Sequence, residues 1–213
     1  MKFDKYSYLW PPRPDKAIAR NFLSFYERRG FVGQIKMNGT CNVLGVSPDR
    51  QILAKTRHGP TADHKLWSPI PETAVDFSKL PGKGWYVFVA ELMHSKVPGI
   101  RNVNYVNDIL VADGEFLFGS TFTARQEILF NLLLKGRKGK SKEMLSHWEI
   151  SPFLWLAKTF TNGFGDIFDS LNRPEHEGIV LKDPKALLAL CNKKDSNSMW
   201  QVKIRRPHKN YTF

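Results

Sequence analysis

Short segments rich in β-branched and aromatic residues, separated by turn-forming residues, most narrowly limit the folds open to this chain. They lie at 31–36, 41–46, 51–55, 85–92, 105–119, 178–182 and 199–205. Segments of this composition, bounded by glycine, proline, asparagine or aspartate, are typical of β-strands. We therefore expect antiparallel strands joined by turns across most of the chain.

Helical patterns interrupt these strands. Asp15 is predicted to cap a helix that runs to about Arg29, and Gly30 is predicted to end it. Three further helical segments are predicted at 123–135, 151–160 and 166–171. Strands and helices in this order predict an α+β fold built on a mixed sheet.

The length of the chain fits one domain. Its 213 residues, of which 42% are hydrophobic, can bury one sizeable core. We expect a single domain over 1–213, in which 1–30 form an N-terminal helical segment and 31–206 form the core that carries the chemistry.

The charge of the chain favours a polyanionic partner. Thirty-two Lys and Arg residues against twenty Asp and Glu give a formal net charge of +12. Such a balance attracts phosphate-bearing polymers through charge neutralisation and counterion release. The cationic run at 135–142 is interpreted as a solvated loop whose charge can still hold a nucleic-acid backbone.

Cysteine and histidine usage argues against disulfides and zinc. Cys41 and Cys191 are too few for a disulfide framework, which favours a reducing, cytoplasmic setting, or the host cytoplasm if the protein is viral. His58, His94 and His176 lack the short paired spacing of zinc ligands. No segment approaches the roughly 18 apolar residues of a membrane span, so we expect no membrane association.

Charged residues recur near the ends of the predicted strands. The first is Lys36, which lies between a strand and the turn at Gly39. A lysine in this setting is usually a surface charge, so it indicates a functional site only together with other motifs. Those motifs contain Arg57 in AKTRHGP, Glu91 in VFVAELM, Glu177 and Lys182 in EGIVLK, and Lys203 and Arg205 in VKIR.

These motifs, in this order, resemble those of the covalent nucleotidyltransferase superfamily, which includes ATP-dependent DNA and RNA ligases and mRNA capping enzymes. Lys36-Met37-Asn38-Gly39 is similar to the lysine motif Lys-x-(Asp/Asn/His)-Gly of that superfamily. Lys203-Ile204-Arg205 resembles its final Lys-x-Lys, with arginine at the second position. The resemblance covers residues 34–205 and rests on the order of the motifs more than on any one of them.

The resemblance implies an adenylation domain in which antiparallel sheets flank an ATP cleft. Lys36 would attack the α-phosphorus of ATP as a neutral amine, a form favoured by nearby cations, and become lysyl-AMP. Lys182 and Lys203 would stabilise the transition state together with Mg²⁺. Glu91 and Glu177 are the predicted metal-binding residues, because hard cations prefer carboxylate oxygens.

The resemblance also assigns nucleotide contacts. The predicted set is Gln34, Lys36, Gly39, Arg57, Glu91, Glu177, Lys182, Lys203 and Arg205. Gln34 stands where related enzymes contact the purine edge, and its amide both donates and accepts, which suits adenine without excluding guanine. Arg57 is the candidate for contact with a 5′-phosphate. Arg205 stands where the superfamily usually has a second lysine. Its planar guanidinium replaces a compact ammonium group, so its role is not assigned.

The residue that stacks on the base is not identified. Many relatives carry an aromatic residue immediately before the aspartate of a Phe-Asp motif, but here Asn107 precedes Asp108. Tyr105 lies two residues before Asn107. It is either a displaced stacking residue or part of the core.

The branch of the superfamily stays open. KMNGTCN at 36–42 resembles the lysine motif of RNA ligases, whereas the segment 107–129 resembles the Phe-Asp-x-Leu, Asp-Gly and Arg region of ATP-dependent DNA ligases. The few residues after Arg205 leave no room for an OB-fold domain. The resemblance is therefore to a minimal, phage-type ligase. An accessory protein that replaces the missing domain is one alternative, and a truncated catalytic core is another.

The predicted activity is ATP-dependent ligation of DNA or RNA, as in DNA repair. The partner would be a nucleic acid with 5′-phosphate and 3′-hydroxyl ends, with a nicked duplex as the expected form. Two alternatives stay open at this point. One is a GTP-dependent mRNA capping guanylyltransferase, and the other is a non-catalytic nucleic-acid-binding module.

Overall fold

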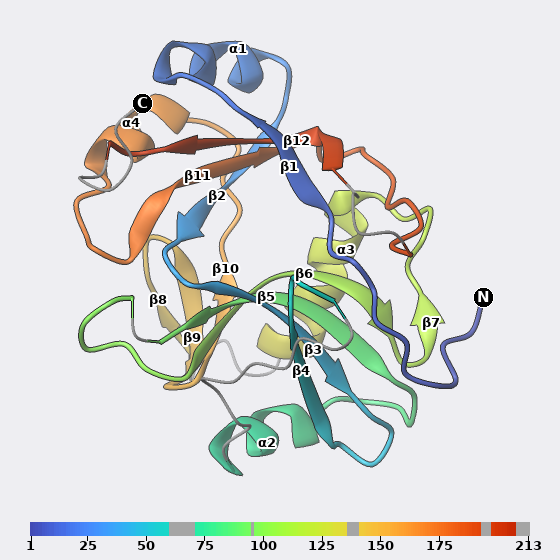
Figure 1. The fold of residues 1–213 in the computed structure, drawn as a ribbon. Helices are drawn as coiled ribbons and strands as arrows, with labels where there is room; N and C mark the ends of the chain where they lie inside the picture. Colours follow the sequence, from blue (N-terminus) through green and yellow to red (C-terminus); the bar gives the residue numbers. More distant parts are fainter. Residues whose placement is uncertain (60–70, 95, 136–140, 193–196, 208–213) are drawn as a thin grey trace.

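Two β-sheets facing each other form the body of the molecule (Figure 1). The computed structural model describes residues 1–59, 71–94, 96–135, 141–192 and 197–207. The larger sheet has the order β4 (Ile52–Thr56), β3 (Thr40–Val46), β5 (Tyr86–Met93), β6 (Val103–Ala112), β10 (Leu154–Ala157), β9 (His147–Ser151) and β8 (Lys142–Glu143), and β7 (Glu115–Phe116) pairs with β6. The smaller sheet has the order β1 (Arg13–Ala17), β12 (Asn197–Arg205), β11 (His176–Lys182) and β2 (Val32–Met37).

Helices cover the outer faces of the two sheets. In Figure 1, α1 (Leu23–Arg28) and α4 (Phe164–Ser170) lie beyond the smaller sheet, and α2 (Pro71–Ser78) lies below the larger one. Helix α3 (Phe122–Leu129) contacts β6 and continues as a π-helical turn over Phe130–Leu134. No helix of the described residues is long and apolar enough to cross a membrane.

Side-chain alternation gives the smaller sheet one apolar and one polar face. Ile35, Ile179 and Ile204 are buried and belong to one apolar cluster with Leu23 of α1 and Phe164 of α4. Because neighbouring residues of a strand point to opposite faces, the residues next to these isoleucines face the larger sheet. The polar side chains of the smaller sheet are therefore gathered between the two sheets.

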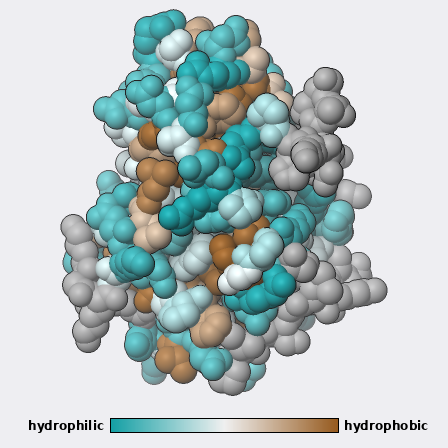
Figure 2. Space-filling model, turned by 90° about the vertical axis from the view of Figure 1, so that its left-hand side faces the viewer, coloured by the Kyte–Doolittle hydropathy of each residue, from teal (hydrophilic) through white to brown (hydrophobic). Residues whose placement is uncertain are grey.

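The surface shown in Figure 2 is mainly hydrophilic. Among its coloured atoms, hydrophobic side chains form small, separate areas rather than one broad patch. The bulk of the apolar side chains lie inside, in clusters on both sheets. This face of the molecule therefore presents mostly polar groups to solvent.

The strands predicted from the sequence are confirmed, and so are two helices. Helix α4 overlaps the segment predicted at 166–171 and begins two residues before it, and α3 with its π-helical turn overlaps the segment predicted at 123–135. Gly30 ends the first helix with a φ of +73°, which favours glycine. Residues 136–140 of the predicted cationic loop lie outside the described residues.

The predicted helix from Asp15 to Arg29 is wrong in its first half. The chain forms strand β1 there, followed by a 3-10 turn at Arg20–Phe22 and the short helix α1. Residues 13–17 gain backbone partners by pairing in parallel with β12, and this pairing outweighs the local helical pattern.

The predicted helix at 151–160 is also wrong. Its apolar run is strand β10, which pairs in parallel with β6 and antiparallel with β9. Short apolar runs are compatible with either a buried strand or a helix, and here the free edge of β6 decides the outcome. The expectation of antiparallel strands is therefore incomplete, because β1 and β10 both form parallel pairs. Helix α2 was not predicted.

Two buried interactions fix the position of the two sheets relative to each other. The hydroxyl of Tyr105 on β6 donates to the carbonyl of Ile35 on β2 over 3.0 Å. Arg125 of α3 forms a bidentate ion pair with Asp108 of β6, at 2.8 and 3.0 Å. The Arg125 guanidinium also lies 5.6 Å from the ring centre of Trp200 on β12. Arg125 thus connects α3 to the larger sheet through Asp108 and to the smaller sheet through Trp200.

Replacing Arg125 by methionine should strongly destabilise the protein. The substitution leaves the buried Asp108 carboxylate without its partner, which costs about 3–5 kcal/mol in the free energy of unfolding. Urea denaturation would measure the change. The matched control is Arg20→Met, because Arg20 pairs with Asp169 in solvent at a side-chain exposure of 56%. Equal losses in the two variants would contradict the structural role of Arg125.

Candidate active site

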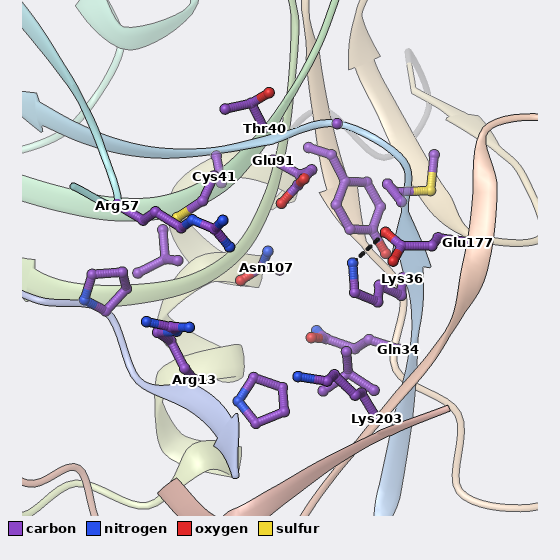
Figure 3. Close-up of a pocket in the computed structure, with 18 of the residues that line it drawn as sticks. Arg13, Gln34, Lys36, Thr40, Cys41, Arg57, Glu91, Asn107, Glu177 and Lys203 are labelled. Atoms are coloured by element: carbon purple, nitrogen blue, oxygen red, sulfur yellow. Dashed lines mark hydrogen bonds and ion pairs between the residues drawn. The ribbon is translucent and has the colours of Figure 1, made fainter. Parts of the chain in front are cut away.

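A cavity of about 370 Å³ lies between the two sheets and is lined by charged side chains (Figure 3). Its walls include all the residues predicted from the sequence, namely Gln34, Lys36, Gly39, Arg57, Glu91, Glu177, Lys182, Lys203 and Arg205. They come from β2, β5, β11 and β12 and from the turns after β2 and β4. Residues up to 171 positions apart in the sequence therefore share one cavity.

Lys36, near the end of β2, forms an ion pair with Glu177 of β11. The second carboxylate oxygen of Glu177 lies 2.5 Å from Nε of Arg205 on β12. Gly178 faces both Lys36 and Arg205 in the strand register. A Cβ at Gly178 would lie 2.0 Å from the carbonyl oxygen of Ile204, so only glycine allows this close approach of the strands. The Glu-Gly pair thus places one carboxylate between two cations.

The turn after Lys36 carries the chain from the smaller sheet to the larger one. A Cβ at Gly39 would lie 2.5 Å from the carbonyl oxygen of Leu92 and 2.7 Å from Cγ of Glu91. Glycine is therefore required where the turn passes over β5. Lys96 donates to the carbonyl of Gly39. Burial raises the pKa of the Glu91 carboxyl, and the nearby charges of Lys36 and Lys96 oppose the shift.

Lys182 lies at the other end of the cavity from the pair of Lys36 and Glu177. Glu177 and Lys182 are five positions apart on β11, which corresponds to about 16 Å along an extended strand. Nζ of Lys182 donates to Oε1 of Gln34 over 2.8 Å and is almost fully buried. Nε2 of Gln34 donates to Gln126 of α3 over 3.0 Å. In this arrangement Lys182 contacts Gln34 rather than the lysine proposed as nucleophile.

Two further cations line the cavity that the sequence analysis did not identify. Arg13 comes from β1, two residues before the predicted start of a helix at Asp15, and Lys96 comes from the turn after β5. The sequence does hold a signal for Arg13, because Pro12 and Pro14 on either side favour extended backbone. Lys96 has no comparable signal.

The structure also places the remaining candidates. Asn107 lines the cavity, and the ring of Tyr105 is buried beside it as part of the core. His58 lines the mouth, whereas His94 contacts the Thr40 hydroxyl at 2.8 Å and His176 is buried at the start of β11. Within the described ranges, no three His, Cys, Asp or Glu residues gather as a metal cluster.

Seven cations and two carboxylates make the cavity strongly positive. The cations are Arg13, Lys36, Arg57, Lys96, Lys182, Lys203 and Arg205. Burial lowers the pKa of Lys203, and the nearby charges of Arg205, Lys36 and Arg13 lower it further. A concave site with this excess of positive charge concentrates polyanions such as phosphate esters.

Comparison with known proteins agrees with this geometry at the level of the fold. No protein-family model and no curated protein matches the chain. Mycobacterial DNA ligase D complexed with ATP is similar in structure, with a TM-score of 0.60 and 12% identity over 90% of this chain. The ATP-dependent DNA ligase of bacteriophage T7 in complex with ATP has a TM-score of 0.55 and 12% identity over 92% of this chain.

This chain covers 60% of the mycobacterial chain and 68% of the bacteriophage chain. Identities this low carry information about the fold alone. The chain therefore has the fold of the nucleotidyltransferase domain of ATP-dependent ligases, which confirms the predicted fold class.

The burial of Lys182 predicts a pH-dependent stability. Burial lowers its pKa from 10.5 to about 8, and the Asp108 carboxylate opposes the shift. Between these values the unfolded chain binds more protons than the folded one, so the free energy of unfolding rises with pH. Relative to Lys182→Met, the wild-type value should rise by up to about 1.4 kcal/mol per pH unit between about pH 8 and 10.5.

Urea denaturation at several pH values would test this. Lys16→Met is the matched control, because Lys16 is exposed on β1. Curves for wild type and Lys182→Met that stay parallel across this pH range would contradict the prediction.

Proposed function

We propose that the protein is an ATP-dependent polynucleotide ligase that works through a covalent lysyl-AMP on Lys36. The proposal rests chiefly on one observation: Lys36 faces a strongly positive cavity while paired with Glu177, which also contacts Arg205. The similarity of the fold to ligases solved with ATP supports it. A lysine amine in a phosphate-binding cavity is suited to attack on phosphorus.

The first step transfers an adenylyl group to Lys36. The lone pair of the neutral Nζ attacks the α-phosphorus of ATP, and the bond from that phosphorus to the bridging oxygen of the β-phosphate breaks. Pyrophosphate leaves with the bonding electrons, and the nitrogen gives one N–H proton to solvent as the phosphoramidate forms. Lys36 must first leave its ion pair, and Arg205 remains beside Glu177 to offset the freed carboxylate.

The cations around Lys36 would stabilise charge on the phosphate oxygens. Lys203 and Arg205 extend from β12 on the same side of the cavity, and Lys96 lies near Gly39. Fixed positive charges that need no reorganisation are effective at stabilising such transition states. Lys203 is thus proposed as a catalytic residue, whereas the contacts of Lys182 support a role in holding Gln34.

The carboxylates of the cavity fit a magnesium ion whose remaining ligands are phosphate oxygens and water. Glu91 and Glu177 are the two acidic residues in its walls, and Mg²⁺ commonly takes one or two carboxylates together with phosphate oxygens and water. When bound there, Mg²⁺ would supply positive charge to the departing pyrophosphate. The carboxylates of this chain would orient it.

Gln34 is proposed to face the base. Its amide cannot turn freely, because Oε1 accepts from Lys182, which can only donate, and Nε2 donates to Gln126. The choice of ATP rests on the similarity to ligases solved with ATP, since an amide can read either purine.

Two further steps would complete ligation. An oxygen of a 5′-phosphate attacks the phosphorus of lysyl-AMP, the phosphorus–nitrogen bond breaks, and Lys36 recovers a proton. A 3′-hydroxyl then attacks the adenylylated end, and AMP leaves as the new phosphodiester forms. The strand can be DNA or RNA, because the lysine motif and the region around Asp108 resemble different branches.

Lys36→Ala should abolish covalent labelling by nucleotide. Wild-type protein incubated with Mg²⁺ and α-labelled ATP should carry label on a denaturing gel, whereas α-labelled GTP should give little. A chase with nicked DNA or RNA should move the label to a 5′-phosphate and so identify the strand. Lys36→Arg is the matched control, since it keeps the charge beside Glu177 but lacks the nucleophilic amine. Labelling of either variant would refute Lys36 as the attachment site.

Arg57→Ala should leave self-adenylylation intact while slowing the later steps that seal the strand. Arg57 is exposed at the mouth of the cavity, away from the pair of Lys36 and Glu177. The variant should still label itself with ATP but seal nicks about 10- to 100-fold more slowly, as expected for loss of a charged hydrogen bond. Single-turnover sealing by pre-labelled protein is the measurement. Sealing at the wild-type rate would remove Arg57 from the phosphate contact.

A further inference from the structure

The N-terminal segment joins the two sheets (Figure 1), and its residues 11–14 line the cavity. The hydroxyl of Tyr8 donates to the carbonyl of Thr56, at the end of β4, over 2.8 Å. The ring of Trp10 packs on Gly59, where an added Cβ would lie 2.9 Å from a ring atom. Residues 8–10 are thus fixed to the turn that follows β4 in the larger sheet.

The same segment then enters the smaller sheet. Strand β1 begins at Arg13, only three residues after Trp10, and pairs in parallel with β12. Pro12 and Pro14 restrict the backbone on both sides of Arg13. Because Arg57 lies between Thr56 and Gly59, the contacts that hold Tyr8 and Trp10 also set the position of Arg13 relative to Arg57.

Both guanidinium groups point into one side of the cavity. Figure 3 shows Arg57 and Arg13 together on the left, whereas Lys36 and Glu177 lie on the right. The Cys41 thiol lies close to both arginines. Burial raises its pKa to about 12, the Glu91 carboxylate adds to that shift, and the positive charges of Arg57, Arg13 and Lys36 oppose it. Both arginines therefore lie within electrostatic reach of the same thiol.

In the part of the chain that the structure describes, neither Arg13 nor Arg57 has a carboxylate as ion-pair partner, whereas Lys36 and Arg205 share Glu177. Two guanidinium groups that face one volume repel each other unless an anion lies between them. Their planar forks are suited to bind phosphate oxygens in a bidentate manner.

We propose that Arg13 and Arg57 form one anion site that holds the terminal 5′-phosphate of the nucleic-acid strand. The inference rests on the proposed ligase function and adds the N-terminal strand to the substrate-binding surface. A terminal phosphate monoester carries a charge close to −2 at neutral pH, while each internal phosphodiester carries −1. A site with two arginines thus favours the end of a strand over its interior.

The test is the preference for a 5′-phosphate in binding. Affinities for nicked duplexes of DNA and of RNA, each with a 5′-phosphate or a 5′-hydroxyl at the nick, would be measured in EDTA so that no sealing occurs. Wild type should prefer the 5′-phosphate, and Arg13→Ala should lose about tenfold of that preference. Arg13→Lys should lose part of it, because it keeps the charge but not the fork.

Lys16→Ala is the matched control. Lys16 carries the same charge on the same strand, is exposed and lies outside the walls of the cavity. It should lower affinity for both nicks alike or not at all, and leave the preference unchanged. The double variant Arg13→Ala/Arg57→Ala should lose less preference than the product of the two single losses, because both side chains bind the same phosphate.

Several results would overturn the proposal. The first is a wild-type protein that binds the 5′-phosphate and the 5′-hydroxyl nicks equally well. The second is an Arg13→Ala variant that keeps the wild-type preference for the 5′-phosphate. The third is a double variant whose loss of preference equals the product of the two single losses. A higher ATP requirement for labelling in Arg13→Ala, with the preference unchanged, would instead place Arg13 on the triphosphate. A 5′-phosphate preference that depends on Arg13, without Lys36-dependent labelling, would refute the ligase but keep this site. Labelling without an Arg13-dependent preference would refute the site alone.

Discussion

Repulsion among the cations of the cavity is the constraint on which the rest of the site depends. Among the described residues, seven positive side chains line one space, with Glu91 and Glu177 as the carboxylates against them. Glu177 offsets Lys36 and Arg205 directly, and the half-buried Glu91 lies under Gly39. Within the described part of the chain the cavity thus keeps an excess of positive charge. This charge pattern is complementary to phosphate groups.

The fold produces this pattern through two close approaches of backbone. At Gly178, β11 and β12 come so near that a side chain would collide with Ile204, and this places Glu177 between cations of the two neighbouring strands. At Gly39, the chain leaves the smaller sheet and passes directly over β5 of the larger one. Both glycines serve geometry rather than chemistry. They explain why the charged residues of separate strands meet at one place.

The sequence predicted the strands and the residues that line the cavity, because strand periodicity and motif order are local properties. It failed where a partner distant in sequence decides the outcome. Strand β1 forms because β12 offers it an edge, and β10 because β6 does. The contact of Lys182 with Gln34, which itself contacts Gln126 of α3, is likewise set by residues distant in sequence. No spacing within EGIVLK reveals that neighbour, and the role of Lys182 beside the transition state stays a prediction.

The N-terminal segment also has a mechanical consequence. In Figure 1 the two sheets are joined on one side by the passage from β2 to β3 and on the other by the chain that leads into β1. A third passage, from β10 to β11, also links the larger sheet to the smaller one. Connections at three places restrict rotation of one sheet against the other more than a single connection would. The distance across the cavity is therefore set by the chain itself as well as by the side chains that line it.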